Sequence, residues 1–185
     1  MIRLLTIIII FFCCFRPEDK KDTLVWNEAR LLTWDDFRGK PAKRFSAAST
    51  HYDIFKNMEE KGHGAQMNIE AVFFCDKSWK KSNWVNDEVL AHEQKHFDIV
   101  ELFARKLRQS VQSRKYGSYD QLKAVSDSLY DVNDKEMDAY QDKYDDETDA
   151  SMNGEKQREW NKKIDTELAN YSAWKSAAFA ISYSK

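Results

Sequence analysis

The chain has 185 residues, of which 42% are hydrophobic and 14% aromatic, with 29 basic and 31 acidic side chains. This apolar share, with six tryptophans, is typical of a folded domain and excludes a wholly disordered chain and a polytopic membrane protein. The formal net charge of −2 offers no basic surface for nucleic acid, so no nucleic-acid partner is expected. Three cysteines cannot build a disulfide scaffold.

The first residues have the pattern of a secretory signal. Arg3 precedes an apolar run from Leu4 to Phe15, which is shorter than the roughly 20 residues of a spanning helix. A retained N-terminal anchor is the alternative, and a cysteine pair at the end of the run leaves lipid attachment open. We therefore expect a signal peptide or anchor over residues 1–16, a charged spacer over 17–23 and one domain over 24–185.

The hydrophobic pattern of the domain changes from a strand period to a helix period. Residues 45–55 and 65–75 alternate as two strands do, and the glycines of the segment 57–64 between them favour an antiparallel hairpin. Apolar residues then recur at helical spacing in three long segments, over residues 86–114, 120–148 and 155–182. The sequence predicts an α+β fold, with a small antiparallel sheet followed by three long helices.

The first predicted helix contains His92-Glu93-Gln94-Lys95-His96, an HExxH motif. Residues four apart lie one turn apart on the same helix face, so the two imidazoles can bind one zinc ion at about 2.0–2.1 Å. Glu93 lies beside His92 and could act as general base for a water molecule that attacks a carbonyl. The motif therefore predicts a zinc site with His92 and His96 as ligands and Glu93 as catalytic residue.

A catalytic zinc ion takes a third protein ligand, which the sequence leaves open. The chain has two other histidines, His51 and His63, on or near the hairpin. The strongest carboxylate candidates lie at the end of the second predicted helix, over residues 144–149. A second helix that returns antiparallel to the first could bring this end near the metal.

Five short segments together carry a family resemblance. They are Leu32-x-Trp34-x-Asp36-Phe37, Phe74-x-x-x-Ser78-Trp79, Leu90-x-His92-Glu93-Gln94-x-His96-Phe97-Asp98-Ile99-x-Glu101-x-x-Ala104-Arg105, Tyr144-Asp145-x-Glu147-Thr148 and Gln157-x-x-Trp160. Over roughly residues 24–164 the chain resembles the DUF922 family of bacterial predicted secreted zinc-dependent proteases. The resemblance implies a zincin-like fold, a location in the bacterial cell envelope (periplasmic or secreted), and His92, His96 and Glu93 in the roles given above.

This sequence departs from the family pattern at one position. A histidine usually follows the Tyr-Asp-x-x-Thr segment, two residues after the threonine, and is a plausible third ligand there. The position is Ala150 in this chain. We expect Asp149 to replace that histidine as the third ligand, with Asp145, His51, His63 or water as alternatives.

Two functions follow as expectations. The first is a zinc-dependent metallopeptidase of the envelope with a peptide or protein substrate, in contact with the membrane only through the leader or a lipid anchor. The second is a non-catalytic zincin-like envelope protein that acts as a binding or interaction module and whose metal site is structural or degraded, which the departure at Ala150 favours. Asp98 could orient a ligand histidine, and Tyr144 could donate to an oxyanion, although a packing role is expected for Tyr144.

Overall fold

The computed structural model describes residues 22–43 and 46–184; the expected leader and most of the charged spacer lie outside these ranges. The described chain is an α+β fold, as the sequence predicts. None of its helices is long and apolar enough to cross a membrane. In chain order the elements are β1 (Thr23–Val25), a 3₁₀ helix (Trp34–Asp36), β2 (Ala48–Ser49), β3 (Tyr52–Glu60), β4 (Gly64–Phe74), β5 (Trp79–Lys80), α1 (Asp87–Gln112), α2 (Tyr119–Thr148), α3 (Gly154–Asn170), a second 3₁₀ helix (Ser172–Trp174) and β6 (Ala178–Ser182).

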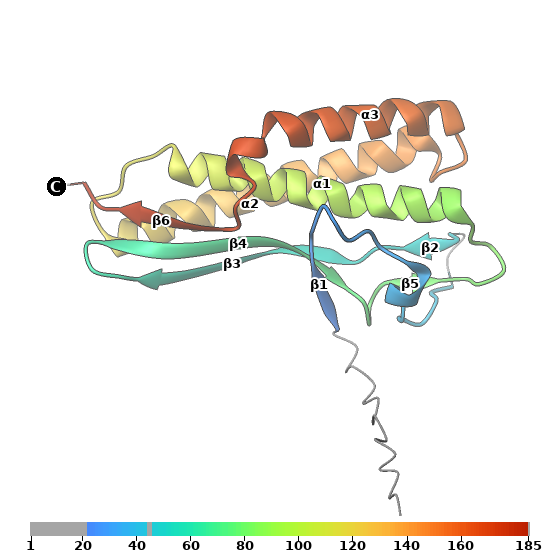
Figure 1. Cartoon of the computed structure of the whole chain (residues 1–185), viewed down its shortest axis with the longest axis horizontal. Coiled ribbons are helices and arrows are strands. Elements are labelled where there is room, and N and C mark those ends of the chain that lie inside the picture. The colour runs from blue at the N-terminus through green and yellow to red at the C-terminus, as the bar shows by residue number, and fades with distance from the viewer. Residues whose placement is uncertain (1–21, 44–45, 185) are drawn as a thin grey trace, which may run out of the picture.

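The molecule has two layers, a sheet below and three helices above (Figure 1). β4 is the central strand, with β3 along one edge, while β1 and β6 share the other edge. All of these pairs are antiparallel, and β2 forms a separate two-stranded sheet with β5. The alternating residues of β4 that the sequence places on one face are fully buried: Met67, Ile69, Ala71 and Phe73.

The hairpin extends further than the sequence suggests. β3 and β4 stay paired from Tyr52–Phe73 to Glu60–Ala65, through the segment 57–64 that was expected to be a connection. The actual turn is short, and Gly62 adopts a positive φ of 61° there. The start of the first predicted strand instead belongs to β2, which pairs with β5. The prediction was wrong here because polar alternation on the exposed face of a sheet resembles loop composition.

The third helix is shorter than expected. It ends at Asn170 rather than continuing to residue 182, and the chain forms β6 after a 3₁₀ turn. β6 pairs with the N-terminal half of β4, from Asn68–Ala178 to Gly64–Ser182. Hydrogen bonds to an open strand edge thus override a helical spacing of apolar residues, which a sequence pattern alone does not reveal.

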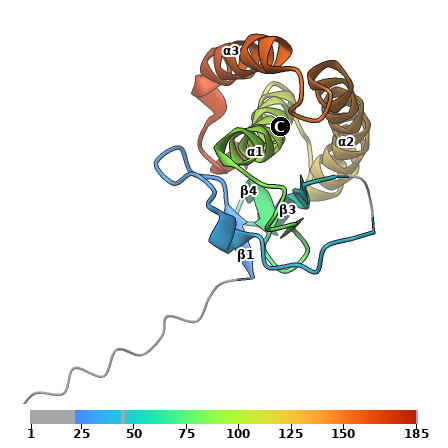
Figure 2. The ribbon, with the colours of Figure 1, turned by 90° about the vertical axis from the view of Figure 1, so that its right-hand side faces the viewer.

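α1 packs against β4 and is flanked by α2 and α3 (Figure 2), and most of its residues from His92 onward are buried. Three charged residues on its buried length form one network. Glu101 Oε1 accepts hydrogen bonds from Arg105 Nε at 2.8 Å and from Arg108 Nη1 at 2.9 Å. Arg108 also donates to the carbonyl oxygen of Ile69 at 2.7 Å, which ties the helix directly to β4.

Replacing Gly64 by alanine should detach β6. A Cβ at Gly64 would collide with the carbonyl oxygen of Ile181, whereas one at Gly117 would meet only the flexible Gln121 side chain at 3.4 Å. We expect Gly64→Ala to lower the free energy of unfolding by about 1–3 kcal/mol because backbone must shift to relieve the overlap. Denaturant unfolding checks this, with Gly117→Ala as the control; equal midpoints for the two variants would contradict the close approach.

Candidate metal centre

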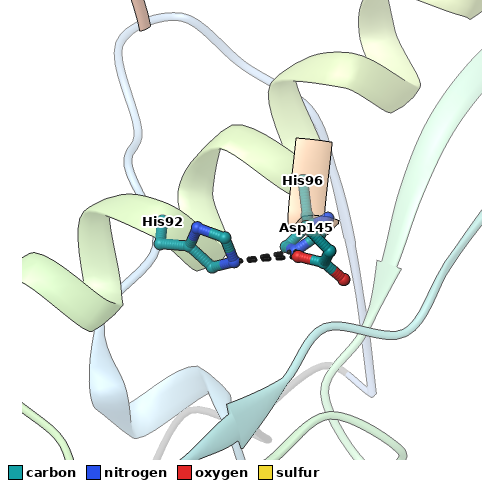
Figure 3. Close-up of side chains that lie close together, drawn as sticks. All are labelled: His92, His96 and Asp145. Atoms are coloured by element: carbon teal, nitrogen blue, oxygen red, sulfur yellow. Dashed lines mark hydrogen bonds and ion pairs between the residues drawn. The ribbon is translucent and has the colours of Figure 1, made fainter. Parts of the chain in front are cut away.

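α1 and α2 bring three ligand atoms together. Asn86 caps α1 by accepting a hydrogen bond from the Val89 amide at 2.9 Å, which fixes where the helix begins. His92 and His96 then lie one turn apart, and Asp145 reaches them from α2 (Figure 3). Nε2 of His92 lies 3.2 Å from Nε2 of His96, and Asp145 Oδ1 lies 3.1 Å from the first and 3.0 Å from the second.

These separations suit a shared cation. Three ligand atoms bound tetrahedrally at about 2.0–2.1 Å would lie about 3.3 Å from one another. Two imidazole nitrogens and one carboxylate oxygen form a ligand set that zinc accepts. Among the described residues, His92, His96 and Asp145 are the group found to place such atoms close enough to hold a metal ion.

Two glutamines orient the imidazoles. Gln141 Oε1 lies 2.6 Å from Nδ1 of His96, and Gln157 Oε1 lies 2.9 Å from Nδ1 of His92. Each glutamine oxygen must face its histidine because the amide nitrogens donate elsewhere, Gln141 to the His96 carbonyl and Gln157 to the Tyr144 hydroxyl. Each Nδ1–H therefore donates to a glutamine, and each Nε2 turns toward Asp145 as a potential ligand.

Tyr144 supports the site from behind. Its ring stacks on His92 with the centroids 4.6 Å apart and the planes at 17°. Its hydroxyl donates to the His92 carbonyl oxygen at 3.2 Å and accepts from Gln157, so it is not aimed at a substrate. Tyr144 is fully buried, which agrees with the packing role rather than with an oxyanion donor.

Glu93 lies beside the three ligand atoms but outside their group. Its side chain is buried, and Thr50 Oγ1 donates to its Oε2 at 2.7 Å. No described residue donates a hydrogen bond to the other oxygen, Oε1. The Thr50 hydroxyl, in the segment between β2 and β3, thus fixes one oxygen of the Glu93 carboxylate and leaves the other available to accept a proton.

His92, His96 and Asp145 line a cavity of about 770 Å³. One wall is the segment 46–50 with Tyr52 and Trp79, and α1 forms the floor. The opposite wall is the C-terminal end of α2 with the loop that follows it. The remaining described lining residues are Asn83, Trp84, Asn86, Val89, His92, Glu93, His96, Gln141, Asp142, Asp145, Asp149, Ala150 and Met152. A substrate group that enters this cavity meets the imidazoles and Glu93 together.

The structure brings Asp145, not Asp149, to the two histidines. Asp149 ends α2 in a left-handed conformation, with φ of 49°, one turn beyond the residue that faces the imidazoles. Ala150, at the position of the family histidine, follows in the same conformation and lines the cavity. Asp145 therefore replaces Asp149 as the expected third ligand.

The two histidine alternatives lie elsewhere. His51 falls between Thr50 and Tyr52, which line the cavity, but His51 itself is exposed and is not among the lining residues. His63 lies in the β3–β4 turn, where its carbonyl oxygen accepts from the Tyr183 amide. Tyr183 bridges to Tyr116, beyond the C-terminal end of α1. About 24 Å of helix separates that end from His96, at roughly 1.5 Å per residue.

Asp98 does not orient a ligand histidine, contrary to the sequence-based suggestion. Its oxygens accept from the Trp26 indole at 2.9 Å, the Gln94 amide at 2.8 Å and the Lys95 ammonium at 2.9 Å. The residues that do orient the site, Gln141 and Gln157, were missed. Only Gln157 had a signal, because it belongs to the Gln157-x-x-Trp160 segment of the family resemblance.

The carboxylate of Asp145 favours the protonated form of His96. Burial alone would lower the pKa of His96, but the hydrogen bond and charge of Asp145, with the charge of Glu93, raise it to about 9. Burial of Asp145 opposes its ionisation, yet hydrogen bonds from His92 and His96 hold the pKa of Asp145 well below its usual range. The centre thus retains positive charge opposite a carboxylate, and a metal cation would displace that proton.

Replacing either orienting glutamine should weaken metal binding without unfolding the chain. We expect Gln141→Met and Gln157→Met each to lower zinc affinity about 10- to 100-fold, because the imidazoles lose the acceptors that fix them. Competition with a fluorescent chelator measures this, and Gln109→Met, near the C-terminal end of α1, is the matched control. Wild-type affinity in both site variants would show that the amides do not act through the metal.

The metal-free protein should lose stability as the pH rises. The pKa of His96 rises on folding from 6.5 to about 9, so its protonation stabilises the fold fully below about pH 6.5, and this contribution disappears as the pH passes about 9. Denaturant unfolding of chelator-treated protein from pH 6 to 9.5 tests this. His96→Asn should flatten that part of the profile; identical slopes in the two proteins would contradict the shift.

Comparison with family models adds an independent result. Residues 41–154, more than half of the chain, match the family described as "Bacterial protein of unknown function (DUF922)". The match contains β2 to α2 with His92, Glu93, His96 and Asp145, while the Trp34 and Gln157 segments of the resemblance lie outside it. Comparisons with curated proteins and with solved structures give no match. The chain belongs to the bacterial DUF922 family.

Proposed function

We propose that this protein is a zinc-dependent metallopeptidase of the bacterial cell envelope, with His92, His96 and Asp145 as metal ligands and Glu93 as general base. The observation that carries the proposal is the convergence of three ligand atoms within 3.2 Å of one another at the wall of a cavity that also contains Glu93. Nitrogen and oxygen ligands of this kind favour zinc.

Each group of the chain has a defined task in this proposal. A bound zinc ion would supply Lewis acidity toward a peptide carbonyl and lower the pKa of water. Gln141 and Gln157 keep both imidazole Nε2 atoms directed at the centre. Thr50 holds Oε2 of Glu93, so that Oε1 can take a proton from the attacking water and deliver it to the leaving amine.

The envelope location and the peptide substrate rest on other support. The apolar N-terminal segment of the sequence has the form of a secretory leader. A cavity of about 770 Å³ is large enough for several residues of an extended peptide. A non-catalytic protein whose metal group is structural or degraded is the alternative, and Ala150 at the position of the family histidine favours it.

Glu93→Gln should separate metal binding from catalysis. We expect the variant to retain about one zinc ion per chain and to lose 100- to 10,000-fold in peptide hydrolysis, because an amide cannot accept the proton. His92→Ala should lose both the metal and the activity. Elemental analysis of dialysed protein and cleavage of an unfolded protein substrate such as casein provide the two measurements.

The outcomes distinguish the two functions. Full activity in Glu93→Gln would remove Glu93 from the mechanism. A wild-type protein that keeps its zinc but cleaves no peptide at any pH between 6 and 9 would favour the non-catalytic alternative. Wild-type protein without zinc after metal loading would contradict the peptidase and favour the non-catalytic alternative with a degraded site.

A further inference from the structure

Two of the exposed large apolar side chains lie at the metal cavity. Trp84 is 52% exposed and Met152 is 81% exposed, and both line the cavity that contains His92 and Glu93. The Lys81 ammonium lies 4.6 Å from the centre of the Trp84 ring, and about half of this side chain still faces solvent. Exposed apolar surface inside a concave site is typical of ligand contact.

The apolar residues occupy one end of the cleft. Trp84 precedes α1 and Met152 follows α2, and these two loops lie at the same end of the molecule (Figure 1). The pairs His92–Asp145 and His96–Gln141 show that α1 and α2 run antiparallel. The cleft therefore runs from the Trp84 and Met152 end, past the ligand atoms, to the end where Gln141 lies.

Apart from the Trp84 end, where the Lys81 ammonium lies against the ring, the described lining of this cleft is negatively charged. Its described lining includes four carboxylates, Glu93, Asp142, Asp145 and Asp149, and no lysine or arginine. Asp142 lies beyond Asp145, toward the Gln141 end, and no described cation forms an ion pair with it. Burial raises the pKa of Tyr52, and the charges of Asp138, Asp145 and Asp142 raise it further, so these carboxylates act on the cavity wall.

We infer that the cleft selects extended peptides that place a large apolar side chain against Trp84 and Met152 and that carry basic rather than acidic residues toward Asp142. The inference rests on the proposed function because it places the scissile bond at His92, His96 and Asp145. The occupant is a substrate peptide rather than a second copy of the chain, since the apolar residues are continuous with the cavity that leads to the metal. Two carboxylates beyond the ligand set and Glu93 would repel an acidic peptide.

Three blocked hexapeptides test this selection. The first contains one leucine and one lysine in an alanine background, the second replaces the leucine by alanine, and the third replaces the lysine by glutamate. Zinc-loaded Glu93→Gln protein reports binding by calorimetry, and zinc-loaded wild type reports kcat/KM. We expect the first peptide to exceed the alanine peptide by about 10-fold or more, as one buried apolar group permits, and to exceed the glutamate peptide because the carboxylates of the cleft repel its charge.

Substitutions of Met152 and Trp84 test whether these residues contact the leucine side chain of the peptide. In Met152→Ala and in Trp84→Ala the ratio between the leucine and alanine peptides should fall toward one, with zinc content unchanged. Leu31→Ala, which truncates a 65% exposed side chain outside the cavity, is the matched control and should keep the wild-type ratio. Since Met152 is so exposed, its truncation leaves the fold intact and keeps the test valid if Trp84→Ala does not fold.

The binding and cleavage measurements distinguish failure of this inference from failure of the proposed peptidase activity. Selective binding by Glu93→Gln with no cleavage by wild type supports this inference and removes the peptidase activity. Equal cleavage of the leucine and alanine peptides would contradict the inference but not the peptidase activity. The same holds if neither Met152→Ala nor Trp84→Ala changes the ratio between these two peptides. Absence of binding to all three peptides also overturns it.

Discussion

The structure depends on one close approach, that of two imidazole nitrogens and a carboxylate oxygen. Nε2 of His92 and Nε2 of His96 lie 3.2 Å apart. Two unprotonated nitrogens at this distance repel each other through their lone pairs unless a positive charge lies between them. A proton on His96 satisfies the arrangement in part, and a divalent ion would satisfy it fully. Such a centre costs stability unless a cation is present, and structures commonly retain such costs at functional sites.

Each helix contributes one part of this arrangement. α1 supplies the imidazoles, α2 supplies Asp145 with Gln141 and Tyr144, and α3 supplies Gln157. The hydrogen bond between Gln157 and His92 therefore makes the docking of α3 part of the candidate metal centre. Buried polar groups of this kind specify one packing of the helices, because any shift would leave amides and imidazoles without partners.

The sequence predicts what depends on local geometry. The HExxH spacing places His92 and His96 one turn apart with Glu93 beside His92, because this relation is set within a single helical turn. The alternation of β4 identifies its buried face. The third ligand depends on the depth at which α2 crosses α1, and a one-turn difference separates Asp145 from Asp149. The orienting glutamines depend on the same docking, and a glutamine has no pattern that distinguishes this role from solvent exposure.

The sequence did not predict β6, for a similar reason. Its residues have a helical spacing of apolar side chains, and only the open edge of β4, more than a hundred residues earlier in the chain, makes them a strand. Pairing between such distant segments has a large loop-closure entropy and slows folding.

This late pairing has a consequence for the order of folding during synthesis. The N-terminal half of β4 emerges from the ribosome with one edge unpaired, and it stays so until residues 178–182 have been made. Arg108 Nη1 also donates to the carbonyl oxygen of Trp174 at 3.0 Å, so this buried charge of α1 gains its last partner only near the end of translation. A nascent chain would therefore expose this edge to chaperones or export factors throughout its synthesis.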